Sequence, residues 1–142
     1  MELKDVNILL VEDDDIDVMV IKRAFSKLNI NNKLHIAHDG LEALSILRGN
    51  VNKAALKAPY MILLDLNMPR MNGFEFLKEL RSDPKLNKSI VFVLTTSSSE
   101  DDIHKSYSQY IAGYIVKKNF EGSFLKAIEM LKSYWKIIEF PA

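Results

Sequence analysis

The sequence predicts an α/β domain with an open, doubly wound sheet of five parallel strands. Two observations carry this prediction. Five short apolar segments alternate along the chain with segments whose apolar residues recur at helical spacing. The third and fourth apolar segments are apolar at consecutive positions, which is typical of strands buried on both faces of a parallel sheet. The chain has 142 residues, of which 48% are hydrophobic, so we expect one domain with a sizeable core.

The five predicted strands follow one another with clear breaks between them. They are residues 6–11 ("VNILLV"), residues 33–37 ("KLHIA"), the segment "YMILLDL" from Tyr60, residues 89–94 ("SIVFVL") and the segment "GYIVK" from Gly113. Parallel strands need right-handed crossover connections, so the helices must cover both faces of the sheet. Five strands in this alternation fit the flavodoxin-like order 2-1-3-4-5, with a site at the carboxyl ends of strands 1 and 3.

The five predicted helices each carry apolar residues on one face. In chain order these residues are Val18, Ile21, Phe25 and Leu28; Leu41, Leu44, Ile46 and Leu47; Phe74, Leu77 and Leu80, with Arg81; Ile103, Tyr107 and Tyr110 or Ile111; and Phe124, Leu125, Ile128, Leu131 and Trp135. Asp39 is the predicted N-cap of the second helix, and Glu42 completes a capping box with it. The segment "SSSEDD" at residues 97–102 offers caps and acids to the start of the fourth helix.

Carboxylates follow the first and third predicted strands. Glu12 and Asp13 end the first strand, and Asp65 ends the third. These strands are neighbours in the predicted sheet, so the three side chains should converge and repel one another. A hard divalent cation such as Mg²⁺ relieves this repulsion, because it prefers oxygen ligands. The acids that come next are explained instead as a solvated helix start, where they favour the helix dipole: Asp14, Asp15 and Asp17.

Two further strands end in polar residues at the same edge of the sheet. Thr95 and Thr96 follow the fourth strand, and Lys117 follows the fifth. Taken singly, Thr95 is a β-branched strand residue and Lys117 a surface lysine. Together with Asp65, a hydroxyl and an ammonium group at matching strand ends predict a site that stabilises a phosphoryl group.

The composition narrows the classes of partner. Lys and Arg number 19, as do Asp and Glu, so the formal net charge of +0 gives no electrostatic reason to expect nucleic acid or an anionic membrane. The chain has no Cys, which agrees with a reducing cytoplasm. The first residues lack the design of a signal peptide, and no apolar stretch is long enough to span a bilayer. We therefore expect a cytoplasmic protein.

Four separated motifs stand in a characteristic order: "LLVEDDD", "LLDLNMPRMNG", "VFVLTTSS" and "AGYIVKK". On these motifs the chain, from residue 6 to about residue 131, resembles the receiver domains of two-component response regulators. The ending "MLKSYWKIIEFPA" and the expected absence of an output domain are most similar to stand-alone regulators paired with phytochrome-type histidine kinases. The resemblance implies a single receiver domain over residues 1–142, with an extension of the last helix from about residue 132.

The resemblance also implies the function. The chain would accept a phosphoryl group from a histidine kinase or a phosphotransfer protein at Asp65, and would not be an enzyme beyond assisting its own phosphorylation and dephosphorylation. Mg²⁺ would be held by Glu12, Asp13, Asp65 and the backbone carbonyl of Asn67. The dipeptide Met68-Pro69 would stiffen the loop that follows, and Gly73 would free the turn into the third helix.

The remaining site residues follow from the same resemblance. Thr95 and Lys117 would stabilise the phosphoryl group, and Thr95 and Tyr114 would report it by moving. Tyr114 has an equal alternative as a plain strand residue. The family usually has a proline after the lysine, joined by a cis bond, whereas this chain has Lys118. A cis bond to a residue other than proline costs ~3 kcal/mol, so either the loop bears that cost or the bond is trans and the loop is remodelled.

Two other functions are alternatives to a switch that is controlled by phosphorylation. A phosphohydrolase of the haloacid dehalogenase type needs a second aspartate two residues after the nucleophile, and Asn67 occupies that position. A degenerate receiver that acts only as an interaction module should lack an acid, Thr95 or Lys117, and none of these is missing.

The C-terminal segment "SYWKIIEFPA" carries more apolar residues than a minimal receiver domain needs: Tyr134, Trp135, Ile137, Ile138 and Phe140. A domain of this size has little core left to bury them, so we expect a symmetric homodimer through helix 4, strand 5, helix 5 and this tail. The alternative is that the last helix runs longer and these residues fold back onto their neighbours.

Overall fold

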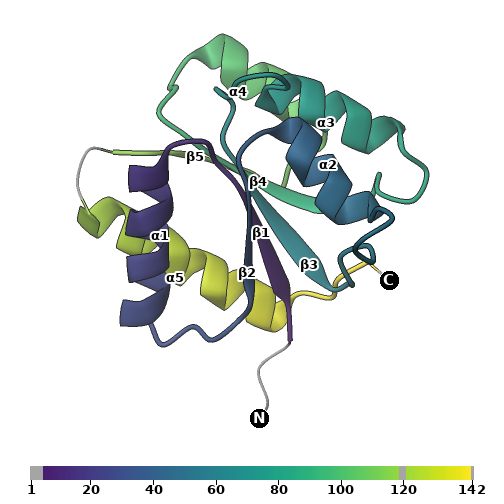
Figure 1. The fold of residues 1–142 in the computed structure, drawn as a ribbon. Coiled ribbons are helices and arrows are strands. Elements are labelled where there is room, and N and C mark those ends of the chain that lie inside the picture. The colour runs from purple at the N-terminus through teal and green to yellow at the C-terminus, as the bar shows by residue number, and fades with distance from the viewer. Residues whose placement is uncertain (1–4, 119–120, 142) are drawn as a thin grey trace.

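The computed structural model describes residues 5–118 and 121–141 of the chain. These residues form a five-stranded parallel sheet in the order β2-β1-β3-β4-β5 (Figure 1), which confirms the predicted fold. Each strand begins within one residue of its predicted start: β1 (Asn7–Val11), β2 (Leu34–Ala37), β3 (Tyr60–Leu64), β4 (Ile90–Thr95) and β5 (Gly113–Val116).

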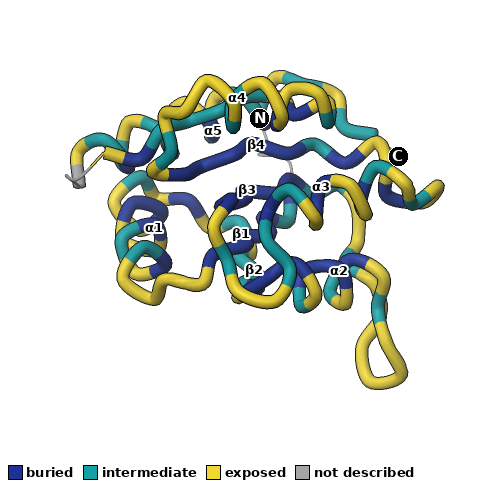
Figure 2. Tube along the Cα trace, turned by 90° about the horizontal axis from the view of Figure 1, so that it is seen from above, coloured by how far each residue is buried: buried dark blue, intermediate teal, exposed yellow. Residues whose placement is uncertain are grey.

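Helices cover both faces of the sheet. They are α1 (Asp15–Lys27), α2 (Gly40–Arg48), α3 (Gly73–Ser82), α4 (Glu100–Tyr107) and α5 (Glu121–Ile137). Figure 1 shows α1 and α5 together on one face and α2, α3 and α4 on the other. Figure 2 shows the buried strands between these layers and exposed residues on the outer surfaces of the helices. Among the described residues, no helix has both the length and the apolar composition that a membrane crossing requires.

Successive strand residues supply two separate apolar cores, one on each face. In β1, Ile8 and Leu10 join the core under α1 and α5, whereas Leu9 and Val11 join the core under α2 and α3. The same alternation continues through β3 and β4. Side chains alternate between faces along a strand, so a strand covered on both sides must be apolar at every position. This explains the consecutive apolar residues in the sequence.

One predicted helix cap needs correction. Asp39 does cap α2, where its carboxylate accepts from the backbone amide of Glu42 at 2.9 Å. The predicted capping box is wrong, because the Glu42 carboxylate accepts from the amide of His38, one residue before the cap. A complete capping box is found instead at α3, between Asn72 and Glu75.

The predicted apolar stripe of α4 is wrong for its two tyrosines. Tyr107 and Tyr110 are 49% and 81% exposed, and Ile111 is the buried member of the series. The helix ends at Tyr107, and Tyr110 has a left-handed backbone with φ of 58°. Tyr110 therefore lies outside the helix, and α4 presents Tyr107 to the surface.

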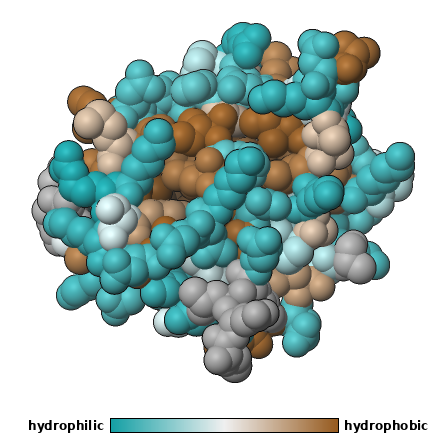
Figure 3. Space-filling view, turned by 60° about the horizontal axis from the view of Figure 1, so that its bottom comes forward, coloured by the Kyte–Doolittle hydropathy of each residue, from teal (hydrophilic) through white to brown (hydrophobic). Residues whose placement is uncertain are grey.

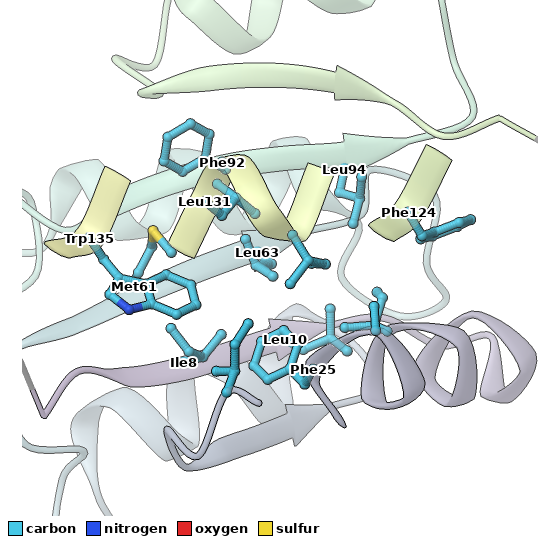
Figure 4. Close-up of a cluster of buried hydrophobic side chains, with 14 of the residues drawn as sticks. Ile8, Leu10, Phe25, Met61, Leu63, Phe92, Leu94, Phe124, Leu131 and Trp135 are labelled. Atoms are coloured by element: carbon cyan, nitrogen blue, oxygen red, sulfur yellow. The ribbon is translucent and has the colours of Figure 1, made fainter. Parts of the chain in front are cut away.

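The C-terminal segment contributes to the core of the domain. Trp135 is 1% exposed, and its ring lies 6.3 Å from that of Phe25. Figure 4 shows Trp135 beside Met61 under the sheet. Tyr134 packs edge-on against Phe92 at 4.9 Å. The expectation that no core is left for these residues is therefore wrong for Trp135 and Tyr134, because α5 lies along α1 and completes the apolar layer between them.

Arg81 fastens α3 to two loops at the edge of the sheet. Its guanidinium group donates to the backbone carbonyls of Asn87 and Ser89 at 2.9 and 2.8 Å, and to those of Gln109 and Tyr110 at 2.7 and 3.0 Å. The planar fork of arginine suits such multiple contacts. Arg81 thus has a structural role that the helical pattern alone did not indicate.

Candidate functional site

The predicted convergence of carboxylates is confirmed. Val11 pairs with Leu64 in the sheet, so the residues that follow them emerge side by side at the carboxyl edge. Oxygen atoms of Glu12, Asp13 and Asp65 lie within 4.8 Å of one another. Opposite ligands of octahedral Mg²⁺ are about 4.2 Å apart, so this donor set fits the ion after a small inward movement.

Lys117 joins three carboxylates at this edge. Its Nζ donates to Glu12, lies 2.9 Å from Asp17 Oδ2 and stands 3.9 Å from Asp65 Oδ2. Its backbone amide donates to the carbonyl of Thr95 at 2.6 Å, which fixes the start of the lysine side chain. Lys117 is buried, so it is not the ordinary surface lysine of the alternative reading.

Asp17 is a site residue that the sequence analysis missed. Of the three acids explained as a helix start, Asp14 is the N-cap of α1 and the Asp15 carboxylate is largely exposed, as expected. Asp17 instead turns inward and pairs with Lys117. The sequence contained no indication of this contact, because the number of carboxylates around a buried ammonium group depends on the three-dimensional fold.

The two most buried charged groups influence each other's titration. Burial raises the pKa of Glu12, Lys117 lowers it, and Asp65 raises it, so the net direction is upward. Burial lowers the pKa of Lys117, but hydrogen bonds to Glu12 and Asp17 and the charge of Asp65 outweigh burial, so the net direction is upward. Lys117 therefore stays an ammonium ion next to Asp65.

Thr95 is the last residue of β4, and its side-chain hydroxyl group is buried in an unusual way. The residue is 0% exposed, and its hydroxyl group has no hydrogen-bond partner within the part of the chain that the structure describes. Buried hydroxyl groups are nearly always hydrogen-bonded, because an unpaired one has lost its water without compensation. Because β4 adjoins β3, Thr95 and Asp65 both lie at the carboxyl edge of the sheet.

The unpaired hydroxyl leads to a stability prediction. We expect Thr95→Val to raise the free energy of unfolding by about 1 kcal/mol, because valine has a similar shape and no buried polar group to satisfy. Urea denaturation measures this change, with the exposed neighbour substituted as Thr96→Val for comparison. A marked loss of stability in Thr95→Val alone would mean that the hydroxyl has a partner in solution.

Tyr114 connects β5 to the segment after β4. Its hydroxyl group donates to the carbonyl of Ser97 at 2.9 Å, and the Ser97 hydroxyl donates to Asp102 of α4 at 2.6 Å. The ring is half-buried and packs against the core under α2 and α3. Tyr114 is thus bonded to the same segment that begins with Thr95, and its movement remains a prediction.

The loop after β3 approaches the site closely. A Cβ atom on Gly73 would lie 2.7 Å from the backbone oxygen of Asp65 and 2.7 Å from Leu66 Cα. Among the described glycines, Gly49 alone has positive φ, so the predicted need for conformational freedom at Gly73 is wrong. Glycine is required there because a side chain would collide with the backbone that carries Asp65.

Two further features fix this edge of the sheet. Arg70, at φ 61°, donates to Asp39 at 2.6 and 2.7 Å and so ties the loop that contains the exposed Asn67 to the start of α2. Among the described residues, Ala58–Pro59 is the one cis peptide bond, so Lys117–Lys118 is trans. The bond is therefore trans at the position where the family usually has a cis proline; residues 119–120 of the loop that follows lie outside the described residues.

A parallel sheet in this order with acids, a threonine and a lysine at one edge defines a receiver domain. The chain belongs to the response regulator receiver domain family, whose family model matches residues 8–129. It is 36% identical over 128 residues to the probable methanogenesis regulatory protein FilR2 of Methanothrix harundinacea, which covers 90% of this chain and 82% of that protein. It is 35% identical over 128 residues to response regulator Rcp1 of Synechocystis sp., which covers 90% and 87%.

Solved structures of response regulators are similar to this chain in fold. The phosphorylated cyanobacterial phytochrome response regulator RcpA matches with a TM-score of 0.88 and 34% identity, covering 96% of this chain and 99% of that chain. The Mn²⁺-bound form of Rcp1 matches with a TM-score of 0.84 and 33% identity, again covering 96% and 99%. The predicted resemblance to regulators associated with phytochromes is confirmed.

Proposed function

We propose that Asp65 accepts a phosphoryl group from a phosphohistidine and that the phosphorylated chain changes its contacts with other proteins. One observation carries this proposal: the Asp65 carboxylate lies close to the Lys117 ammonium group and to two further carboxylates, with the unpaired Thr95 hydroxyl on the next strand. This arrangement suits a group that arrives with negative charge and oxygen acceptors. The receiver domain family is consistent with this role.

The chain's own residues have separate tasks in this reaction. The amide of Leu66 donates to Asp65 Oδ1 at 2.9 Å, which orients the carboxylate and leaves Oδ2 toward Lys117. An oxygen of Asp65 attacks phosphorus, and the P–N bond breaks with its electron pair returning to the histidine nitrogen. Lys117 offsets the charge of the phosphoryl oxygens, and Thr95 donates a hydrogen bond to one of them. Water then attacks phosphorus, the P–O bond to Asp65 breaks, and inorganic phosphate leaves, which restores the Asp65 carboxylate.

Mg²⁺ fits the donor set of this edge. Glu12, Asp13 and Asp65 would hold it together with the backbone carbonyl of Asn67. When bound, the ion supplies positive charge that offsets the charge of the phosphoryl oxygens. The Mn²⁺-bound form of the relative Rcp1 supports a divalent ion in this family.

Removal of one carboxylate tests the metal site. We expect Mg²⁺ to bind wild-type protein weakly, with NMR shifts centred on the amides of residues 12, 13 and 65, and we expect Asp13→Ala to lose these shifts. Asp15→Ala serves as the control, because this exposed acid lies near the same edge. Equal Mg²⁺ affinity in Asp13→Ala and wild type would exclude Asp13 as a ligand.

Incubation with a small phosphodonor such as acetyl phosphate tests the proposed function. Intact-mass analysis should show one phosphoryl group per chain in the presence of Mg²⁺ and none in the presence of EDTA. A chain that acts only as an interaction module would stay unmodified in both conditions.

The similarity to Rcp1 and RcpA favours a phytochrome-type histidine kinase as the phosphodonor. The similarity to FilR2 is of the same degree, and its name points to another signal. Phosphotransfer from a purified phytochrome kinase to this chain decides between them. Transfer much slower than with a small phosphodonor would exclude the phytochrome class.

A homodimer through α4, β5 and α5 is a further part of the proposal. Exposed apolar side chains support it, namely Tyr107, Tyr110, Met130 and Ile137. Trp135 is not available to the interface, since it belongs to the core. We expect sedimentation of the phosphorylated chain to show a dimer that the double substitution Tyr107→Ser and Ile137→Ser disrupts. A monomer in both phosphorylation states, or an unaffected dimer, would contradict this interface.

A further inference from the structure

A cavity of about 660 Å³ lies at the edge of the sheet opposite to Asp65. Tyr60 begins β3, Ile90 begins β4, and Pro141 reaches the cavity from the C-terminal segment. β3 has five residues, so the length of the strand, about 17 Å, separates the cavity from Asp65. Its volume falls in the range of small-molecule pockets.

The walls of the cavity are mainly apolar. They include Leu47, Leu56, Pro84, Leu86, Ile90 and Pro141. Two polar groups within the lining satisfy each other, since the hydroxyl groups of Tyr60 and Ser89 are 2.6 Å apart. Figure 3 looks onto this side of the molecule and shows apolar atoms recessed between hydrophilic side chains. Such walls favour binding of an apolar ligand group over a polar one.

The charged residues of the lining are mostly positive. Arg48, Lys85 and Lys88 stand against a single acid, Asp83. Arg48 already pairs with Asp83 at 3.0 Å. Within the described part of the chain, the exposed ammonium groups of Lys85 and Lys88 form no ion pair. The cavity therefore combines an apolar interior with uncompensated positive charge.

We propose that this cavity binds a small amphiphile with one apolar chain or ring and one anionic head group, of the class of medium-chain carboxylates. The apolar part lies between Leu56, Leu86 and Ile90, and the carboxylate faces Lys85 and Lys88. Charge complementarity favours this ligand over a neutral apolar molecule. The size of the cavity suits a single small molecule.

Titration calorimetry of the full chain with octanoate, well below its micellar concentration, tests the proposal. We expect saturable binding of one octanoate per chain, weaker binding of 1-octanol, and an affinity lowered about tenfold by Lys85→Gln with Lys88→Gln. Lys78→Gln with Lys126→Gln makes the same charge change on exposed helix positions away from the cavity and should leave the affinity unchanged. Ala55→Trp places a large ring at the exposed part of the lining and should abolish binding without touching the core.

Several results would overturn the proposal. These are the absence of saturable octanoate binding, equal binding of 1-octanol, and unchanged binding in Ala55→Trp. Sedimentation tests whether the cavity binds a second copy of the chain instead. That occupant would be indicated if the wild type self-associates, if Ala55→Trp is a monomer, and if octanoate does not bind. Phosphorylation of Asp65 has no part in these measurements, so they stand apart from the proposed function.

Discussion

Asp65→Asn is expected to abolish phosphorylation by small phosphodonors and by a histidine kinase while the fold is retained. The amide has almost the shape of the carboxylate, but its oxygen is a poor nucleophile toward phosphorus. One negative charge also leaves a site in which three carboxylates lie within 4.8 Å, so repulsion decreases. Intact-mass analysis after incubation with the phosphodonor and Mg²⁺ measures the effect.

The control for this variant is Asp15→Asn, an exposed aspartate at the start of α1 that makes the same chemical change. It should accept a phosphoryl group like the wild type. Circular dichroism and urea denaturation of Asp65→Asn should show a folded protein whose stability differs from the wild type by about 1 kcal/mol or less. Full labelling of Asp65→Asn on another residue would disprove the assignment of the phosphoacceptor.

Lys117→Met is expected to lower the free energy of unfolding by about 3 kcal/mol in the presence of EDTA. Methionine keeps most of the volume and the apolar stem of lysine but removes the ammonium group. Glu12, which is 1% exposed, then loses its ion pair, and Asp17 and Asp65 lose their shared counter-charge. Removing one partner of a buried ion pair is costly because the other charge remains buried without compensation.

Lys118→Met is the matched control, since it makes the same change at the exposed neighbouring residue. Its stability should stay within about 0.5 kcal/mol of the wild type. Urea denaturation in EDTA, followed by a repeat with Mg²⁺, measures both variants. Because a divalent cation also offsets the charge of the acids, Mg²⁺ should restore part of the stability lost in Lys117→Met. If Lys117→Met were as stable as Lys118→Met in EDTA, the ion pairs of Lys117 would not form in solution.

The strand order and the position of the acids could be predicted because both follow from local pattern and from one rule of topology. Consecutive apolar residues marked the buried strands, and the crossover rule then fixed which strand ends share an edge. The strand order and the positions of the acids in the sequence were enough to predict that Glu12, Asp13 and Asp65 converge.

The parts that could not be predicted depend on contacts between distant segments. Lys117 meets Asp17 and Glu12 across separations of 100 and 105 residues, and no local pattern shows that Asp17 turns inward. The burial of Trp135 depends on how α5 lies along α1, which the length of the helix alone does not determine. Gly73 begins α3, and the reason for glycine there is the close approach of the backbone at Asp65, which joins segments that the sequence pattern does not relate.

Locating the phosphoryl group on the wild-type chain tests whether Asp65 is the phosphoacceptor. After incubation with acetyl phosphate and Mg²⁺, borohydride reduces an acyl phosphate to an alcohol at the modified aspartate, and peptide mass mapping identifies the residue. We expect a single reduced residue, Asp65, directly after β3. Reduction at Asp13 or any other acid, or a phosphorylated chain that resists borohydride, would contradict this expectation.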